Sequence, residues 1–193
     1  MKFAILNKDP LKDYRKACKI TQGIELSDSD SWKPENETEF WIKQIVANHS
    51  TIRSIRFRLT ASAPRSVIMQ LIRATKGHPQ PYVQSSRPDW CGKERSSNPY
   101  EEKLFIMDFT AEAFVELCKQ RLCERTEKRT NQFVWELVDE LRACDVPFFK
   151  AVGYCCHPNC WWHGGKCPEI KACNERISKL SDVIINQYRE DEV

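Results

Sequence analysis

The 193-residue sequence lacks long apolar runs. No stretch approaches the roughly 18 to 20 apolar residues that a membrane-spanning helix needs. The apolar stretch near the start, Phe3 to Leu6, is too short for a secretory signal. Internal repeats and low-complexity linkers are also absent from the sequence. We therefore expect a cytoplasmic protein with no membrane partner, long enough to bury a hydrophobic core as one domain with or without an appendage.

Acidic residues are missing from one long segment, residues 49–88. The formal net charge of the whole chain is only +3, but this basic segment carries seven cationic residues: Arg53, Arg56, Arg58, Arg65, Arg73, Lys76 and Arg87. A local excess of positive charge favours an anionic ligand such as a nucleotide phosphate, or nucleic acid. A solvated charged face is the alternative interpretation.

The sequence also lacks the paired C-x-x-C pattern of common zinc sites, although it contains ten cysteines. Half of them fall in one short stretch that also holds His157 and His163. These candidate metal ligands are Cys155, Cys156, Cys160, Cys167 and Cys173. Thiols stay reduced in the cytosol, so clustering favours a metal site over disulfides. Structural zinc, an iron–sulfur cluster and free thiols remain open, and the other five cysteines are interpreted as buried thiols.

Hydrophobic periodicity predicts a mixed helix and sheet fold. Residues 37–46 have helical spacing, residues 55–61 alternate as a strand, and a helix follows Pro64 with Ser66, Gln70 and Arg73 on its polar face. Six glycines and prolines make residues 76–99 a long loop. Helices are predicted again after Thr110, up to residues 145–147, and over residues 177–188.

We therefore predict an α+β class with three parts. Residues 1–36 are expected to be an irregular lead-in with only a weak helical pattern around Leu11 to Ile20, and residues 37–150 the main domain. Residues 151–193 are expected to form a small cysteine-rich metal-binding segment and a C-terminal helix.

Several segments of residues 37–150 together match a known family in order and spacing. His49-Ser50-Thr51 precedes the predicted strand, Gln70-Leu71-Ile72-Arg73 lies in the following helix, and Ser85-Ser86-Arg87 lies in the loop. Arg121 precedes Pro147 by 26 residues. In this order the segments resemble His-x-Ser, Gln-x-x-Arg, Ser-x-Arg and long-helix Arg motifs of the flavin-dependent thymidylate synthases.

The resemblance implies a fold of the thymidylate synthase-complementing protein type, with an antiparallel sheet and long helices, assembled as a homotetramer. It implies that dUMP or a related pyrimidine deoxynucleotide is bound by Gln70, Arg73, Ser85, Arg87 and Arg121. It also implies that His49, Thr51 and Arg73 contact FAD, which carries a methylene group to uracil C5 in dTMP synthesis. Arg121 would act catalytically by stabilising negative charge on the uracil ring.

The chain departs from the family pattern mainly at groups that the family uses on the flavin. Ala74 and Thr75 replace a His and an Arg, Ile55 replaces a His, and Pro88 replaces a Tyr. Two interpretations follow: an active flavin-dependent methyltransferase, or a non-catalytic nucleotide- or nucleic-acid-binding protein that has lost the flavin site.

Overall fold

A computed structural model describes residues 1–24, 32–74, 81–87, 89, 92, 97–168 and 173. The chain divides into two compact units: Met1–Lys33 with His49–Leu117, and Pro34–Asn48 with Cys118–Val193. No helix among the described residues is both long enough and apolar enough to cross a lipid bilayer. The mixture of helices and an antiparallel sheet confirms the predicted α+β class.

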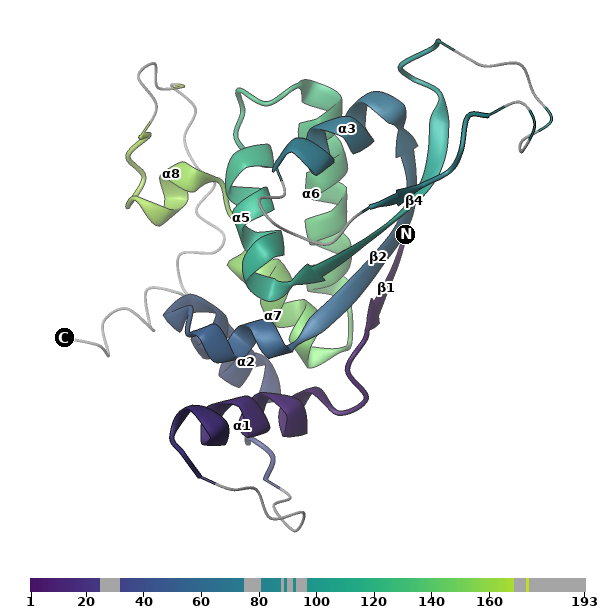
Figure 1. The fold of residues 1–193 in the computed structure, drawn as a ribbon. Helices are drawn as coiled ribbons and strands as arrows, with labels where there is room; N and C mark the ends of the chain where they lie inside the picture. The colour runs from purple at the N-terminus through teal and green to yellow at the C-terminus, as the bar shows by residue number, and fades with distance from the viewer. Residues whose placement is uncertain are drawn as a thin grey trace. The chain divides into compact units, whose positions relative to one another are not determined.

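The first unit is built on a four-stranded antiparallel sheet in the order β1-β2-β4-β3 (Figure 1). The strands are β1 (Lys2–Ile5), β2 (Arg56–Pro64), β3 (Tyr82–Val83) and β4 (Glu102–Thr110). The long central pair runs in register from Arg56 opposite Thr110 to Pro64 opposite Glu102. The prediction for residues 55–61 is thus confirmed, with a strand that extends to Pro64.

One face of the sheet forms the core of this unit. Alternate residues of β2 and β4 are buried because successive side chains of a strand point to opposite faces. The Phe57 and Phe109 rings stack with centroids 5.8 Å apart. Phe114, in the first part of α5 (Ala111–Arg121), meets both rings edge-on at 5.6 and 5.2 Å. The Thr110 side chain caps this helix by accepting a hydrogen bond from the Ala113 amide, as predicted.

Residues 1–36 are not an irregular lead-in, contrary to the prediction. β1 pairs with β2, and α1 (Pro10–Thr21) follows it. Asp9 caps α1 by accepting a hydrogen bond from the Lys12 amide at 3.0 Å, and Pro10 occupies the first turn. Their sequence signal is weak because both elements bury little: Tyr14 is the one buried residue of α1.

The helix predicted after Pro64 is α3 (Arg65–Ala74), and its buried stripe of Val67, Ile68, Leu71 and Ala74 agrees with the prediction. Two of its backbone amides, from Arg65 and Ser66, donate to the carbonyls of Glu101 and Pro99. The short 3-10 helix η1 (Ser50–Ser54) precedes β2.

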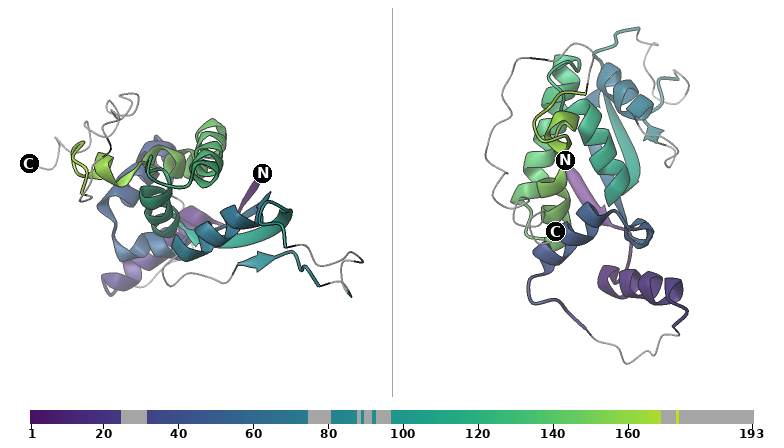
Figure 2. Two further views of the ribbon diagram at one scale, coloured as in Figure 1. Left: turned by 90° about the horizontal axis from the view of Figure 1, so that it is seen from above. Right: turned by 90° about the vertical axis from the view of Figure 1, so that its left-hand side faces the viewer.

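Helices make up the described part of the second unit: α2 (Glu37–Ala47), the end of α5, α6 (Lys128–Ala143), α7 (Pro147–Cys155) and α8 (Asn159–Trp162) (Figures 1 and 2). The expected helices at 37–46 and before residue 145 are confirmed, and Pro147 opens α7 instead of ending the helical region. Trp41 of α2 meets Phe148 of α7 edge-on at 5.3 Å. The helix predicted over residues 177–188 lies outside the described residues.

Candidate functional site

Two arginines of the basic segment are paired with carboxylates. Arg58 on β2 binds Asp108 on β4 through two hydrogen bonds of 2.6 and 2.8 Å. Arg53 forms the same two-pronged contact with Glu112, and these hydrogen bonds raise the pKa of both guanidinium groups. Two of the seven cationic side chains of the basic segment are therefore held in ion pairs with carboxylates of the first unit.

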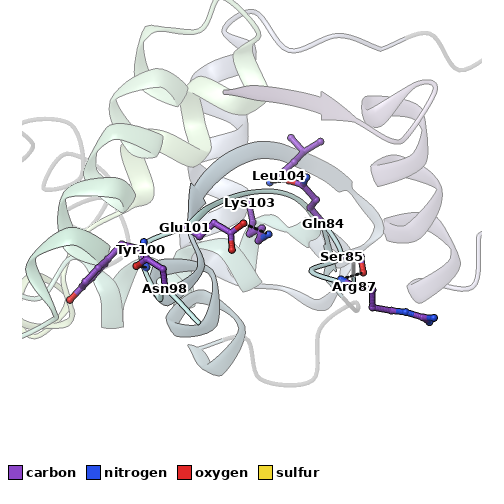
Figure 3. Close-up of polar contacts among 8 residues, drawn as sticks. All are labelled: Gln84, Ser85, Arg87, Asn98, Tyr100, Glu101, Lys103 and Leu104. Atoms are coloured by element: carbon purple, nitrogen blue, oxygen red, sulfur yellow. Dashed lines mark hydrogen bonds and ion pairs between the residues drawn. The ribbon is translucent and has the colours of Figure 1, made fainter. Parts of the chain in front are cut away.

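Ser85 and Arg87 lie in one turn that continues from the edge strand β3 (Figure 3). Gln84 extends the pairing with β4, because its amide donates to the Leu104 carbonyl at 2.8 Å and its side-chain oxygen accepts from the Leu104 amide. The Ser85 hydroxyl then accepts the Arg87 amide at 3.1 Å. The turn thus fixes the backbone from which the Arg87 side chain leaves the sheet.

The Arg87 guanidinium is exposed and binds a carboxylate in two-pronged geometry. Its Nε and Nη2 atoms donate to the two oxygens of Asp89 at 3.2 and 2.5 Å. The two side chains are 63% and 55% exposed. In Figure 3 the Arg87 side chain points away from the other residues drawn. Arg87 therefore presents a planar fork, which matches carboxylate and phosphate oxygens, at the surface of its unit.

A buried ion pair lies at the start of β4, where the sequence reasoning expected no site. The Lys103 side chain is only 5% exposed, on the same face of β4 as Phe105, and its Nζ donates to Glu101 Oε1 at 2.7 Å (Figure 3). Glu101 Oε2 and the Ser66 hydroxyl are buried and have no hydrogen-bond partner within the described residues. In the sequence, the one indication of this ion pair was Lys103, which occupies an inward position of the alternating strand β4.

The other residues predicted to bind the nucleotide are divided between the two units. Gln70 is half-buried and Arg73 exposed on α3, three residues apart on one helix face, in the same unit as the Ser85 turn. Arg121 belongs to the second unit, where its carbonyl accepts a hydrogen bond from Asn131 Nδ2 at 3.1 Å and its side chain is half-buried.

The three residues predicted to contact FAD, His49, Thr51 and Arg73, all lie in the first unit. Thr51 hydrogen-bonds the hydroxyl of Tyr14 on α1, and burial raises the pKa of that phenol to about 12. His49 is exposed at the start of η1 and makes no side-chain capping bond there. Ile55 and Ala74, at family histidine positions, are buried in the apolar core. At these two positions the chain therefore offers no polar side chain to a flavin.

The five cysteines predicted as metal ligands have two different environments. Cys155 and Cys156 end α7 and have no exposed surface, whereas Cys160, Cys167 and Cys173 are partly exposed. Burial raises the pKa of the Cys155 and Cys156 thiols, and Cys156 also hydrogen-bonds Cys118. Within the described ranges, no three His, Cys, Asp or Glu side chains are arranged to hold a metal ion.

The comparisons with known proteins leave the resemblance as a prediction. No model of a known protein family matches the chain, and no curated protein matches it.

Proposed function

We propose that the protein binds a pyrimidine deoxynucleotide, dUMP or a close relative, as a diverged relative of the flavin-dependent thymidylate synthases. The observation that supports this proposal is the exposed two-pronged contact of Arg87 with a carboxylate, beside the Ser85 hydroxyl. Both residues occupy the Ser-x-Arg positions of the resemblance, and the same fork fits two oxygens of a phosphate.

The exchange of Asp89 for a phosphate is energetically favourable on simple grounds. An exposed ion pair such as Arg87 with Asp89 contributes about 0 to 1 kcal/mol. A phosphate carries more negative charge than a carboxylate, so the same guanidinium fork attracts it more strongly. The nucleotide phosphate therefore displaces Asp89 and takes its two contacts.

By resemblance, Gln70 and Arg73 of the same unit join Ser85 and Arg87 in the proposed nucleotide site. A nucleotide contact by Arg121 rests on the resemblance alone. The resemblance also implies a homotetramer with sites between subunits. The misfit on the flavin side favours nucleotide binding without the family's FAD-dependent methyl transfer. Binding is therefore the proposed activity.

Calorimetric titration of the purified protein with dUMP, with deoxyuridine and with a DNA duplex tests this proposal. We expect dUMP to bind, and deoxyuridine to bind at least about tenfold more weakly because it lacks the phosphate that Arg87 holds. No binding of dUMP, together with DNA affinity that falls steeply as salt rises, would instead identify a phosphate-backbone surface. Equal affinities for dUMP and deoxyuridine would also contradict the proposal.

A further inference from the structure

The first turn of α3 meets the start of β4 at a polar junction made of the Ser66, Glu101 and Lys103 side chains. The Ser66 amide donates a hydrogen bond to the Pro99 carbonyl at 2.8 Å, two residues before Glu101. Lys103 pairs in register with Ala63, three residues before Ser66. These two short segments of the first unit therefore lie against each other, which places Ser66 beside the ion pair of Glu101 and Lys103.

Each of the three side chains has hydrogen-bonding capacity left over. The Lys103 ammonium has three N–H groups, and among the described residues its hydrogen bond is to Glu101 Oε1, at 2.7 Å (Figure 3). The second carboxylate oxygen, Glu101 Oε2, and the Ser66 hydroxyl have no partner in the part of the chain that the structure describes. The junction thus offers a donor, an acceptor and a hydroxyl group that can act as either.

Burial makes these groups costly to leave unpaired. The Lys103 side chain is only 5% exposed, and Glu101 Oε2 and Ser66 Oγ have almost no accessible surface. A buried ion pair offsets the cost of its desolvation only where further hydrogen bonds satisfy the remaining protons and lone pairs. In folded proteins, buried polar groups without a protein partner are typically bonded to internal water molecules.

The charge and the hydrogen-bonding groups of the junction select a neutral ligand that both donates and accepts. Glu101 and Lys103 carry opposite charges, so an added ion would be a buried charge without a counterion. A water molecule can accept from an ammonium group and donate to two oxygen atoms. These are the groups that the junction offers, and about three hydrogen bonds are typical of a buried water.

We propose that one internal water molecule binds at this junction, where it accepts a hydrogen bond from Lys103 Nζ and donates to Glu101 Oε2 and Ser66 Oγ. The water completes the hydrogen bonding of the buried ion pair. It also links the side chains at the start of β4 to the first turn of α3, in addition to the backbone hydrogen bonds between the two segments.

A high-resolution crystal structure of the full-length protein tests this assignment. We expect one ordered water within about 2.7 to 3.2 Å of Lys103 Nζ, Glu101 Oε2 and Ser66 Oγ. Lys103→Met should lose this water, because the variant has no ammonium to donate to it. Ser62→Ala is the matched control and should keep it, because the Ser62 hydroxyl binds the exposed Glu102 on the other face of the same strand pair.

Oxygen-17 relaxation dispersion of water gives a second measurement in solution, since it counts long-lived internal water molecules. The wild-type protein should hold one more such water than Lys103→Met and the same number as Ser62→Ala, with folding of each variant verified by circular dichroism. A direct hydrogen bond between Ser66 Oγ and Glu101 with no water between them would overturn the proposal. So would an ion at the junction, or a water that stays there in folded Lys103→Met.

Discussion

Gly153→Ala is expected to lower the free energy of unfolding by about 2 kcal/mol or more. Gly153 lies in α7, and a Cβ atom there would be 2.8 Å from the Arg142 backbone nitrogen and 3.0 Å from the Leu141 Cβ of α6. Backbone cannot move aside as a flexible side chain can, so the two helices must separate. The loss exceeds the gain of about 1 kcal/mol in helix propensity that alanine brings.

The same contact carries a hydrogen bond, which separation of the helices would weaken. Arg142 Nε donates to the Gly153 carbonyl at 3.0 Å, and its Nη2 reaches the Cys156 carbonyl at 3.3 Å. Urea unfolding followed by circular dichroism measures the effect. Lys150→Ala in the same helix is the control, with an expected change within about 0.5 kcal/mol. Gly153→Ala with unchanged stability would show that α6 and α7 do not pack this closely.

Glu101→Ala is expected to destabilise the first unit by about 2 to 3 kcal/mol, because it leaves the Lys103 ammonium buried without its carboxylate. Breaking a fully buried ion pair usually costs as much as this or more. We expect a loss at the low end because the Glu101 side chain is 31% exposed. Lys103→Met replaces the charge with an apolar chain of similar length. We expect it to change stability little, since it removes the desolvated charge.

Glu102→Ala is the matched control for this ion pair. Glu102 is the exposed neighbour on β4, where its carboxylate accepts a hydrogen bond from the Ser62 hydroxyl. Its loss should cost within about 0.5 kcal/mol in the same urea unfolding measurement. Equal effects of Glu101→Ala and Glu102→Ala would contradict a stabilising role of the buried pair.

Sequence periodicity predicted the elements that bury a whole face. α2, α3 and α6 each place several apolar residues against the core, so their helical spacing is evident. β2 was equally evident in the sequence, because its buried residues recur at every second position. The Thr110 cap and the stop before Pro147 were also predicted, because side-chain capping and the missing proline amide are local effects.

Sequence periodicity did not predict the elements that bury little or that carry a charge in the core. β1 is a short strand at the edge of the sheet and was not predicted, and α1 buries Tyr14 alone, so only a weak helical pattern around Leu11 to Ile20 indicated it. β4 was missed because Lys103 occupies an inward position next to Phe105 and interrupts the apolar alternation. The buried ammonium is stabilised by the carboxylate of Glu101, two residues earlier, a contact that the apolar periodicity does not reveal.

The candidate site was predictable from the sequence only as residue types. The Ser-x-Arg pattern indicated an anion site, and the structure adds the turn that orients Arg87 and the carboxylate it holds. Pairing of Arg53 and Arg58 with acidic residues 59 and 50 positions away could not be read from local sequence.

The most direct test of the proposed nucleotide site is the affinity of Arg87→Ala for dUMP, measured by calorimetry beside Arg56→Ala. Arg56 is an exposed arginine of the same basic segment, outside the proposed site. We expect Arg87→Ala to weaken binding by more than about 1 kcal/mol, the contribution of a charge-assisted contact, and Arg56→Ala to leave it unchanged. Unchanged affinity in Arg87→Ala, or an equal loss in both variants, would contradict the assignment of the phosphate to Arg87.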